Sequence, residues 1–146
     1  MRIVLSLIVA TLALAGCGQP PVIHADKGYV RLGATPKSPA AAYFTLYGGA
    51  ADSTLISISS EAAIRSEMHE SMMHGNMSSM MPIDHLPLPA KSTVTFAPGG
   101  KHVMLFDVNP SVKPGKRITL LFTFADGRRF TYDPKTIAAG DPAPDP

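Results

Sequence analysis

Methionine and histidine gather in one stretch of the chain. Seven of its eight methionines and four of its five histidines lie between Met68 and Met104. The densest part, residues 68–81, reads MHESMMHGNMSSMM. Thioether sulfur is a soft metal ligand, and imidazole binds several transition metals. This composition therefore predicts a metal site built from methionine and histidine.

The cysteine content limits which metal site is possible. Cys17 is the only cysteine and lies far from this stretch, so the site must form without thiolate. This excludes a blue-copper electron-transfer centre and the cysteine-based zinc sites. Thioether and imidazole together favour Cu(I), because soft sulfur selects the soft ion yet holds it weakly enough to release it. A methionine site also suits an oxidising compartment, where paired thiols would form disulfides.

The elements that must position these ligands are short strands. From Gly28 onward, β-prone runs alternate with Gly and Pro, and no segment shows a capped amphipathic helix. Many short strands at roughly 8–12-residue spacing predict an all-β sandwich or barrel. The dipeptide Asp126-Gly127 predicts a hairpin with a two-residue type I′ turn. The expected strands are residues 29–32, 41–47, 55–59, 93–96, 102–108, 118–124 and 129–132.

The strand pattern indicates which candidate ligands share a face. His102 and Met104 are two residues apart on one strand, so both point to the same side. Residues 65–84 read as two strands around Gly75-Asn76, which pairs residues whose numbers add up to 151. His69 then lies opposite Pro82, with Met80 diagonal to it on the same face. Unless a bulge intervenes, Met73 joins that face, and the other face carries Met68, Met72, His74, Met77 and Met81.

The four best-placed ligands match a known spacing. Ten residues separate His69 from Met80, twenty-one separate Met80 from His102, and one separates His102 from Met104. This resembles the signature H-x10-M-x21-H-x-M of the PCu(A)C copper-chaperone family. Residues 99–105 (GGKHVML) and 87–94 (PLPAKSTV) are also similar to that family, and the resemblance spans roughly residues 28–132.

The resemblance carries expectations about fold and function. It implies an all-β, cupredoxin-like Greek-key β-sandwich that binds one Cu(I) ion through these four side chains near the surface. It also implies delivery of copper to the CuA centre of cytochrome c oxidase, alongside a Sco-type copper protein. Of the neighbouring acids, Glu67 and Asp107 are candidates to orient a ligand imidazole.

Alternatives to this function remain open. The other methionines are expected to pack the hairpin or lie on its surface. A second, auxiliary copper-gathering site formed by Met72, Met73, His74 and Met77 is the alternative, and it would suit a copper buffering or resistance protein. A metal-free binding module is a further rival. The chain has no G-x-S-x-G elbow or base-orienting third group, so no enzyme is expected.

The ends of the chain predict an envelope location. Residues 1–17 read as a signal peptide, and its last four residues (LAGC) resemble a bacterial lipobox in which Cys17 is lipidated. Gly18, rather than Asp, favours the outer membrane by the same resemblance. We expect a tether over residues 18–27, the copper-binding domain over 28–137 and a disordered tail over 138–146. The net charge of +2 forms no basic stripe, so nucleic acid is not an expected partner.

Overall fold

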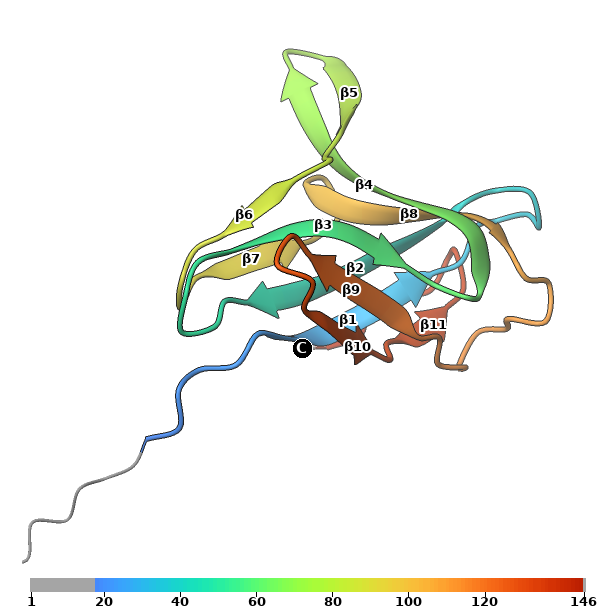
Figure 1. Ribbon diagram of the computed structural model, residues 1–146. Coiled ribbons are helices and arrows are strands. Elements are labelled where there is room, and N and C mark those ends of the chain that lie inside the picture. The colour runs from blue at the N-terminus through green and yellow to red at the C-terminus, as the bar shows by residue number, and fades with distance from the viewer. Residues whose placement is uncertain (1–17, 146) are drawn as a thin grey trace, which may run out of the picture.

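Two β-sheets make up the fold. The computed structural model describes residues 18–145, and within them it contains strands and no helix, which confirms the all-β prediction. The larger sheet consists of β1 (His24–Arg31), β2 (Ala40–Tyr47), β4 (Ala63–His74), β5 (Met77–Pro82), β7 (Thr93–Phe96), β8 (Lys101–Val108) and β11 (Lys135–Ile137). The smaller sheet consists of β3 (Ser53–Ser59), β6 (Leu86–Leu88), β9 (Leu120–Phe124) and β10 (Arg129–Tyr132). The strand orders are β11-β1-β2-β7-β8-β4-β5 and β10-β9-β3-β6 (Figure 1).

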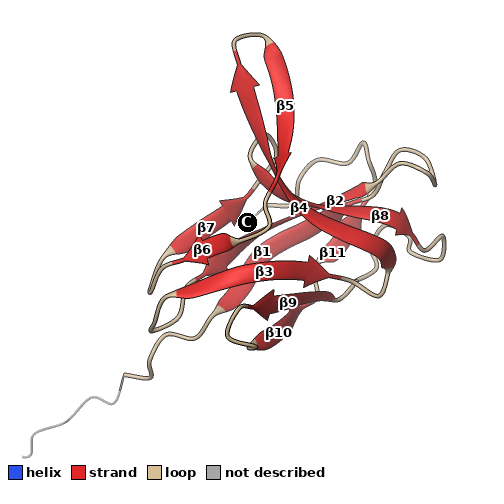
Figure 2. Cartoon of the chain, turned by 45° about the horizontal axis from the view of Figure 1, so that its top comes forward, coloured by secondary structure: helices blue, strands red, loops and turns tan. Residues whose placement is uncertain are grey.

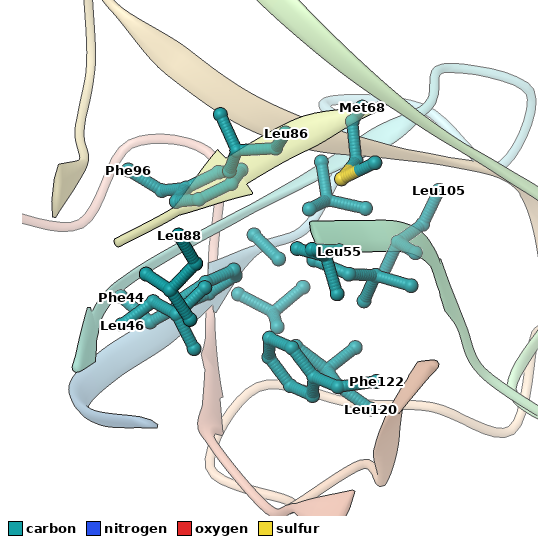
Figure 3. Close-up of a cluster of buried hydrophobic side chains, with 14 of the residues drawn as sticks. Phe44, Leu46, Leu55, Met68, Leu86, Leu88, Phe96, Leu105, Leu120 and Phe122 are labelled. Carbon is teal, nitrogen blue, oxygen red and sulfur yellow. The ribbon is translucent and has the colours of Figure 1, made fainter. Parts of the chain in front are cut away.

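The core lies between the two sheets because their strands alternate apolar and polar residues. On β2 every second residue, from Ala40 to Leu46, is buried, and β9 buries its first, third and fifth residues. Phe44 of the larger sheet stacks on Phe96 at 4.4 Å and meets the edge of Phe122 from the smaller sheet at 5.1 Å between ring centroids. Figure 3 shows this cluster, which also contains Met68. The alternate residues of the larger sheet therefore face away from the core.

A two-stranded ribbon extends beyond the sandwich. β4 pairs with β8 only as far as Glu70, opposite Lys101, and its remaining residues pair with β5 alone. We call residues 71–80 the ribbon; it projects from the body in both views (Figures 1 and 2). Its strands pair as predicted, with residue numbers adding up to 151. Gly75 has a φ of +62°, and glycine suits the first position of such a two-residue turn.

The first strand begins earlier than expected. Residues 24–27, expected in the tether, are the first half of β1, and His24 stacks on Tyr47 with 4.6 Å between ring centroids. A break in the β1–β2 register between Asp26 and Tyr29, where Lys27 has a φ of +51°, interrupts the strand pattern. This irregularity hides the first half of the strand in the sequence. The signal-peptide and Cys17 predictions lie outside the described residues.

Two other expectations are corrected by the structure. The hairpin at Asp126-Gly127 has a three-residue loop, residues 125–127, because the N–H of Phe124 donates to the Arg128 carbonyl at 3.0 Å and the N–H of Gly127 donates to the Phe124 carbonyl at 2.9 Å. Gly127 has a φ of +86°, as the last residue of such a loop requires. At the other end, the expected disordered tail is partly held, since the Arg31 guanidinium donates to the carbonyls of residues 138, 139 and 141.

The described part of the chain has no helix long and apolar enough to cross a membrane.

Candidate metal centre

The predicted ligands lie on the outer face of the larger sheet, where β4 and β8 run side by side. Met68 and Val103 point into the core between these strands. Their neighbours point outward, and the rings of His69 and His102 meet at right angles with centroids 5.9 Å apart. Three successive cross-strand pairs face outward: Arg65 opposite Phe106, Glu67 opposite Met104, and His69 opposite His102. The pairing of two distant strands thus brings the two imidazoles together.

In each imidazole one ring nitrogen is hydrogen-bonded to the protein and the other is not. Nε2 of His69 lies 3.0 Å from Oε2 of Glu67, and Nδ1 of His102 lies 3.0 Å from the Gly100 carbonyl oxygen. Carboxylate and carbonyl oxygens only accept, so both nitrogens carry the proton. Nδ1 of His69 is buried without a hydrogen-bond partner, and no hydrogen bond within residues 18–145 uses Nε2 of His102. With the proton on the nitrogen that donates, the other nitrogen of each ring carries a lone pair that a metal can use.

Glu67 is itself fixed by its neighbours. The Arg65 guanidinium forms an ion pair with the Glu67 carboxylate and lies 3.8 Å above the centre of the Phe106 ring. A carboxylate that accepts from a ligand imidazole sets its tautomer and ring orientation. Glu67 therefore has the position expected of an orienting group. Asp107, the other candidate, is exposed and makes no hydrogen bond or ion pair with the described residues.

An aromatic wall covers one side of the site. His102 is only 5% exposed, and the Tyr43 ring of β2 lies 6.5 Å from it between centroids. Burial raises the pKa of the Tyr43 phenol above its ordinary value, with a smaller contribution from Tyr29. Tyr43 thus stays neutral and adds no charge beside the imidazoles. Sequence reasoning did not select Tyr43, although its place in the aromatic run of residues 41–47 is a signal for a covering residue.

The two methionine ligands differ in exposure. Met104 lies next to His102 on β8 and is partly buried. Met80 lies on β5 opposite Ser71, which places it diagonal to His69, and 58% of its surface is exposed. Met80 and His69 line the same open pocket of about 760 Å³. The structure therefore brings His69, His102 and Met104 together and leaves Met80 at the open rim of the same face.

The methionines outside the four candidate ligands divide between the core and the surface. Met68 is in the core, but Met73 is 68% exposed and Met77 is 76% exposed. Met73 shares the face of Met80, whereas Met72, His74 and Met77 lie on the opposite face of the ribbon, as the register predicted. Of the two expectations for these methionines, packing therefore holds for Met68, and a surface position holds for Met73 and Met77.

The donor set determines what the site can do chemically. Within residues 18–145 no three His, Cys, Asp or Glu side chains converge on a possible metal position. A metal at this face would therefore bind two imidazole nitrogens with thioether sulfur. This neutral, soft set of ligands suits Cu(I). It provides little stabilisation for hard ions such as Mg²⁺ or Ca²⁺, which prefer oxygen ligands.

Solved structures with the same architecture include copper-binding proteins. The copper-bound PCuAC domain from PmoF2 matches with a TM-score of 0.65 and 21% identity, over 83% of this chain and 99% of that one. The Cu(I)-bound DR1885 protein from Deinococcus radiodurans matches with a TM-score of 0.62 and 28% identity, over 84% of this chain and 83% of that one. Both comparisons support the cupredoxin-like β fold expected from the sequence.

Sequence comparisons give the family. Residues 23–135 match the model of the family described as "Putative lipoprotein LpqE-like". A curated relative, "Putative lipoprotein Lxx21020" from Leifsonia xyli subsp. xyli, is 29% identical over 80 residues, which cover 54% of this chain and 48% of that protein. The chain thus spans about half the length of that relative. The family match covers most of the chain, so this protein belongs to the LpqE-like family, a group related to the PCuAC domains whose fold it shares.

Proposed function

We propose that this protein is a copper carrier of the cell envelope that binds one Cu(I) ion through His69, Met80, His102 and Met104. The observation that carries the proposal is that Nδ1 of His69 is buried without a partner in a ring 5.9 Å, between centroids, from the ring of His102, whose Nε2 has no hydrogen bond within residues 18–145. Two thioethers on the same face complete a set that suits Cu(I). The copper-bound PCuAC domain and the Cu(I)-bound DR1885 protein, which share the fold, support the same choice of metal.

Copper is the cargo of this site. The four ligands differ in solvent exposure, and this difference gives the order in which they release the ion. Met80 is at the open rim, whereas His102 is almost fully buried under Tyr43. An incoming ligand from a recipient reaches the Met80 side first and replaces that thioether. The two imidazoles are held in place by hydrogen bonds to Glu67 and Gly100, so they release the copper ion last. Copper then passes from one protein to the other by stepwise ligand exchange, without becoming free.

The recipient we propose is the CuA centre of cytochrome c oxidase, directly or through a Sco-type copper protein. This choice is supported by the His-x-Met spacing shared with the PCu(A)C chaperones. An anchor at Cys17, as the lipoprotein family suggests, would hold the carrier at a membrane; the outer-membrane preference remains a prediction from position 18. The second candidate function is copper buffering or resistance, which the exposed methionines of the ribbon favour.

The primary test is an anaerobic Cu(I) titration of the chain from Gly18 onward against a chromogenic chelator. We expect one tight equivalent. In the double variant His102→Ala/Met104→Leu its dissociation constant should rise by at least about 100-fold, because loss of outer-shell partners alone costs about 10–100-fold. Met73→Leu is the matched control, since Met73 is exposed on the same face. A double variant with the affinity of the wild type would refute the site.

A further inference from the structure

The reverse face of the ribbon gathers a second set of soft donors. We use this name for Met72, His74 and Met77 of the ribbon together with Met81, the residue that follows the ribbon at its base; the β4–β5 register places all four on the side opposite Met80. His74 lies directly across from Met77. Met72 lies across from Ser79, so its two diagonal neighbours are Met77 and Met81. Met72 is therefore within reach of both other methionines, and Met77 is within reach of the imidazole.

No structural role accounts for this cluster. Met77 is 76% exposed and Met81 is 54% exposed, so neither fills the core. His74 is exposed and makes no hydrogen bond with the described residues. Apolar side chains gathered at the surface of a monomer usually mark a site of binding. Met72, His74 and Met77 lie where the hairpin pairs with no third strand, and Met81 lies at its base, so these long side chains can turn toward a common ligand.

The chemistry of the reverse face selects a soft monovalent ion. At its base the Glu70 carboxylate is paired with Lys101 at 2.7 Å. With that acid neutralised, the donors are three thioethers and one imidazole, all uncharged. Such a set favours Cu(I) over Zn(II), which gains little from thioether.

We propose that the reverse face of the ribbon is a second Cu(I) site, independent of the first and weaker. Weaker binding follows from the surroundings, because His74 has no partner comparable to Glu67 and its donors are open to water. The ligand set differs from the auxiliary set expected from the sequence. It leaves out Met73, which the observed register places on the face of Met80, as predicted, and it includes Met81.

The test is an anaerobic Cu(I) titration of three forms of the chain from Gly18 onward. Wild type should bind one tight and one weaker equivalent. His102→Ala/Met104→Leu should keep the weaker equivalent alone, and His74→Ala/Met77→Leu should keep the tight one alone. Unchanged thermal unfolding of the apo variants would show that the exposed substitutions leave the fold intact. Met73→Leu, with a methionine of similar exposure on the other face, should keep both equivalents.

A spectroscopic readout locates the weaker ion. In His102→Ala/Met104→Leu carrying ¹³C-methyl methionine, Cu(I) should shift the methyl resonances of Met72, Met77 and Met81 and leave that of Met73 in place. Zn(II) at the same concentration should shift none of them. The proposal is overturned if this variant binds no Cu(I), or if Met73→Leu loses the weaker equivalent. Absence of the tight equivalent from wild type would instead refute the first site and leave this test unaffected.

Discussion

At the scale of single residues, Glu67 decides how His69 can act. Its carboxylate holds the proton on Nε2 of His69 and thereby leaves Nδ1 of this ring free. Arg65 and Phe106 keep the carboxylate in place. Such partners fix the tautomer of a ligand imidazole and increase its basicity. Glu67 is thus a positioning residue that acts through His69.

Replacing Glu67 tests this role. We expect Glu67→Gln to weaken the tight Cu(I) equivalent by about 10-fold, because the amide accepts the hydrogen bond without the negative charge. Chelator competition measures the affinity, and the NMR shifts of the His69 ring report the tautomer. Glu70→Gln is the control, since Glu70 is also ion-paired but faces the other way. Equal loss in both variants would mean that general charge, and not the Glu67–His69 contact, sets the affinity.

At the scale of elements, the ribbon is a separate unit of stability. Beyond Glu70 its two strands pair only with each other, apart from one hydrogen bond that the Ser71 N–H donates to the Gly100 carbonyl at 3.1 Å. Two-stranded hairpins are marginally stable in water. The conformation of the turn at Gly75 therefore has a large effect on the stability of the ribbon. Gly75 has positive φ, and no atom lies within 4 Å of an added Cβ. A side chain there would strain the backbone alone.

We expect Gly75→Ala to destabilise the ribbon locally by about 1–2 kcal/mol, the cost of a left-handed conformation for an L-residue. Hydrogen exchange of ribbon amides should accelerate by about 5–30-fold, while exchange in β8 and β9 stays unchanged. Asn76 occupies the neighbouring turn position and has no positive φ. Asn76→Ala should therefore leave the hydrogen-exchange rates of the ribbon amides unchanged. If Gly75→Ala speeds exchange throughout the sandwich, the ribbon is not a separate unit.

The same element shows what the sequence could predict. The Gly75-Asn76 turn set the register of the ribbon, so the faces of Met80 and Met81 were predicted correctly. Local signals failed elsewhere: the register break after Asp26 hid the start of β1, and Pro87 argued against a strand at β6. The cover of His102 by Tyr43 was missed because it depends on the pairing of β2 with β8, strands far apart in the sequence.

At the scale of the whole molecule, the folded domain begins close to the predicted anchor. β1 begins at His24 and Ile23 packs into the core, so with Cys17 as anchor the free segment is residues 18–22. Five extended residues reach at most about 17 Å. An anchored carrier of this kind meets recipients only near its own membrane surface, which suits a membrane-bound recipient.

An experiment that measures copper transfer distinguishes a carrier from a buffering protein. We expect the Cu(I)-loaded chain, mixed without oxygen with an apo CuA domain or an apo Sco-type domain, to lose one equivalent to the acceptor. The copper content of the re-isolated acceptor measures this. Chain loaded to the same copper content but carrying His102→Ala/Met104→Leu is the control for copper that simply dissociates. Retention of all copper in the presence of either acceptor would favour buffering.

The β4–β5 pairing also sets an order of assembly during folding. A hairpin closed by two residues forms within microseconds, whereas β4 and β8 must find each other across a long intervening segment. Met72, His74, Met77 and Met81 therefore come together early, before His69 meets His102. If the reverse face binds Cu(I) as we propose, a newly folding chain would hold the ion at the β4–β5 hairpin before the more deeply buried site exists.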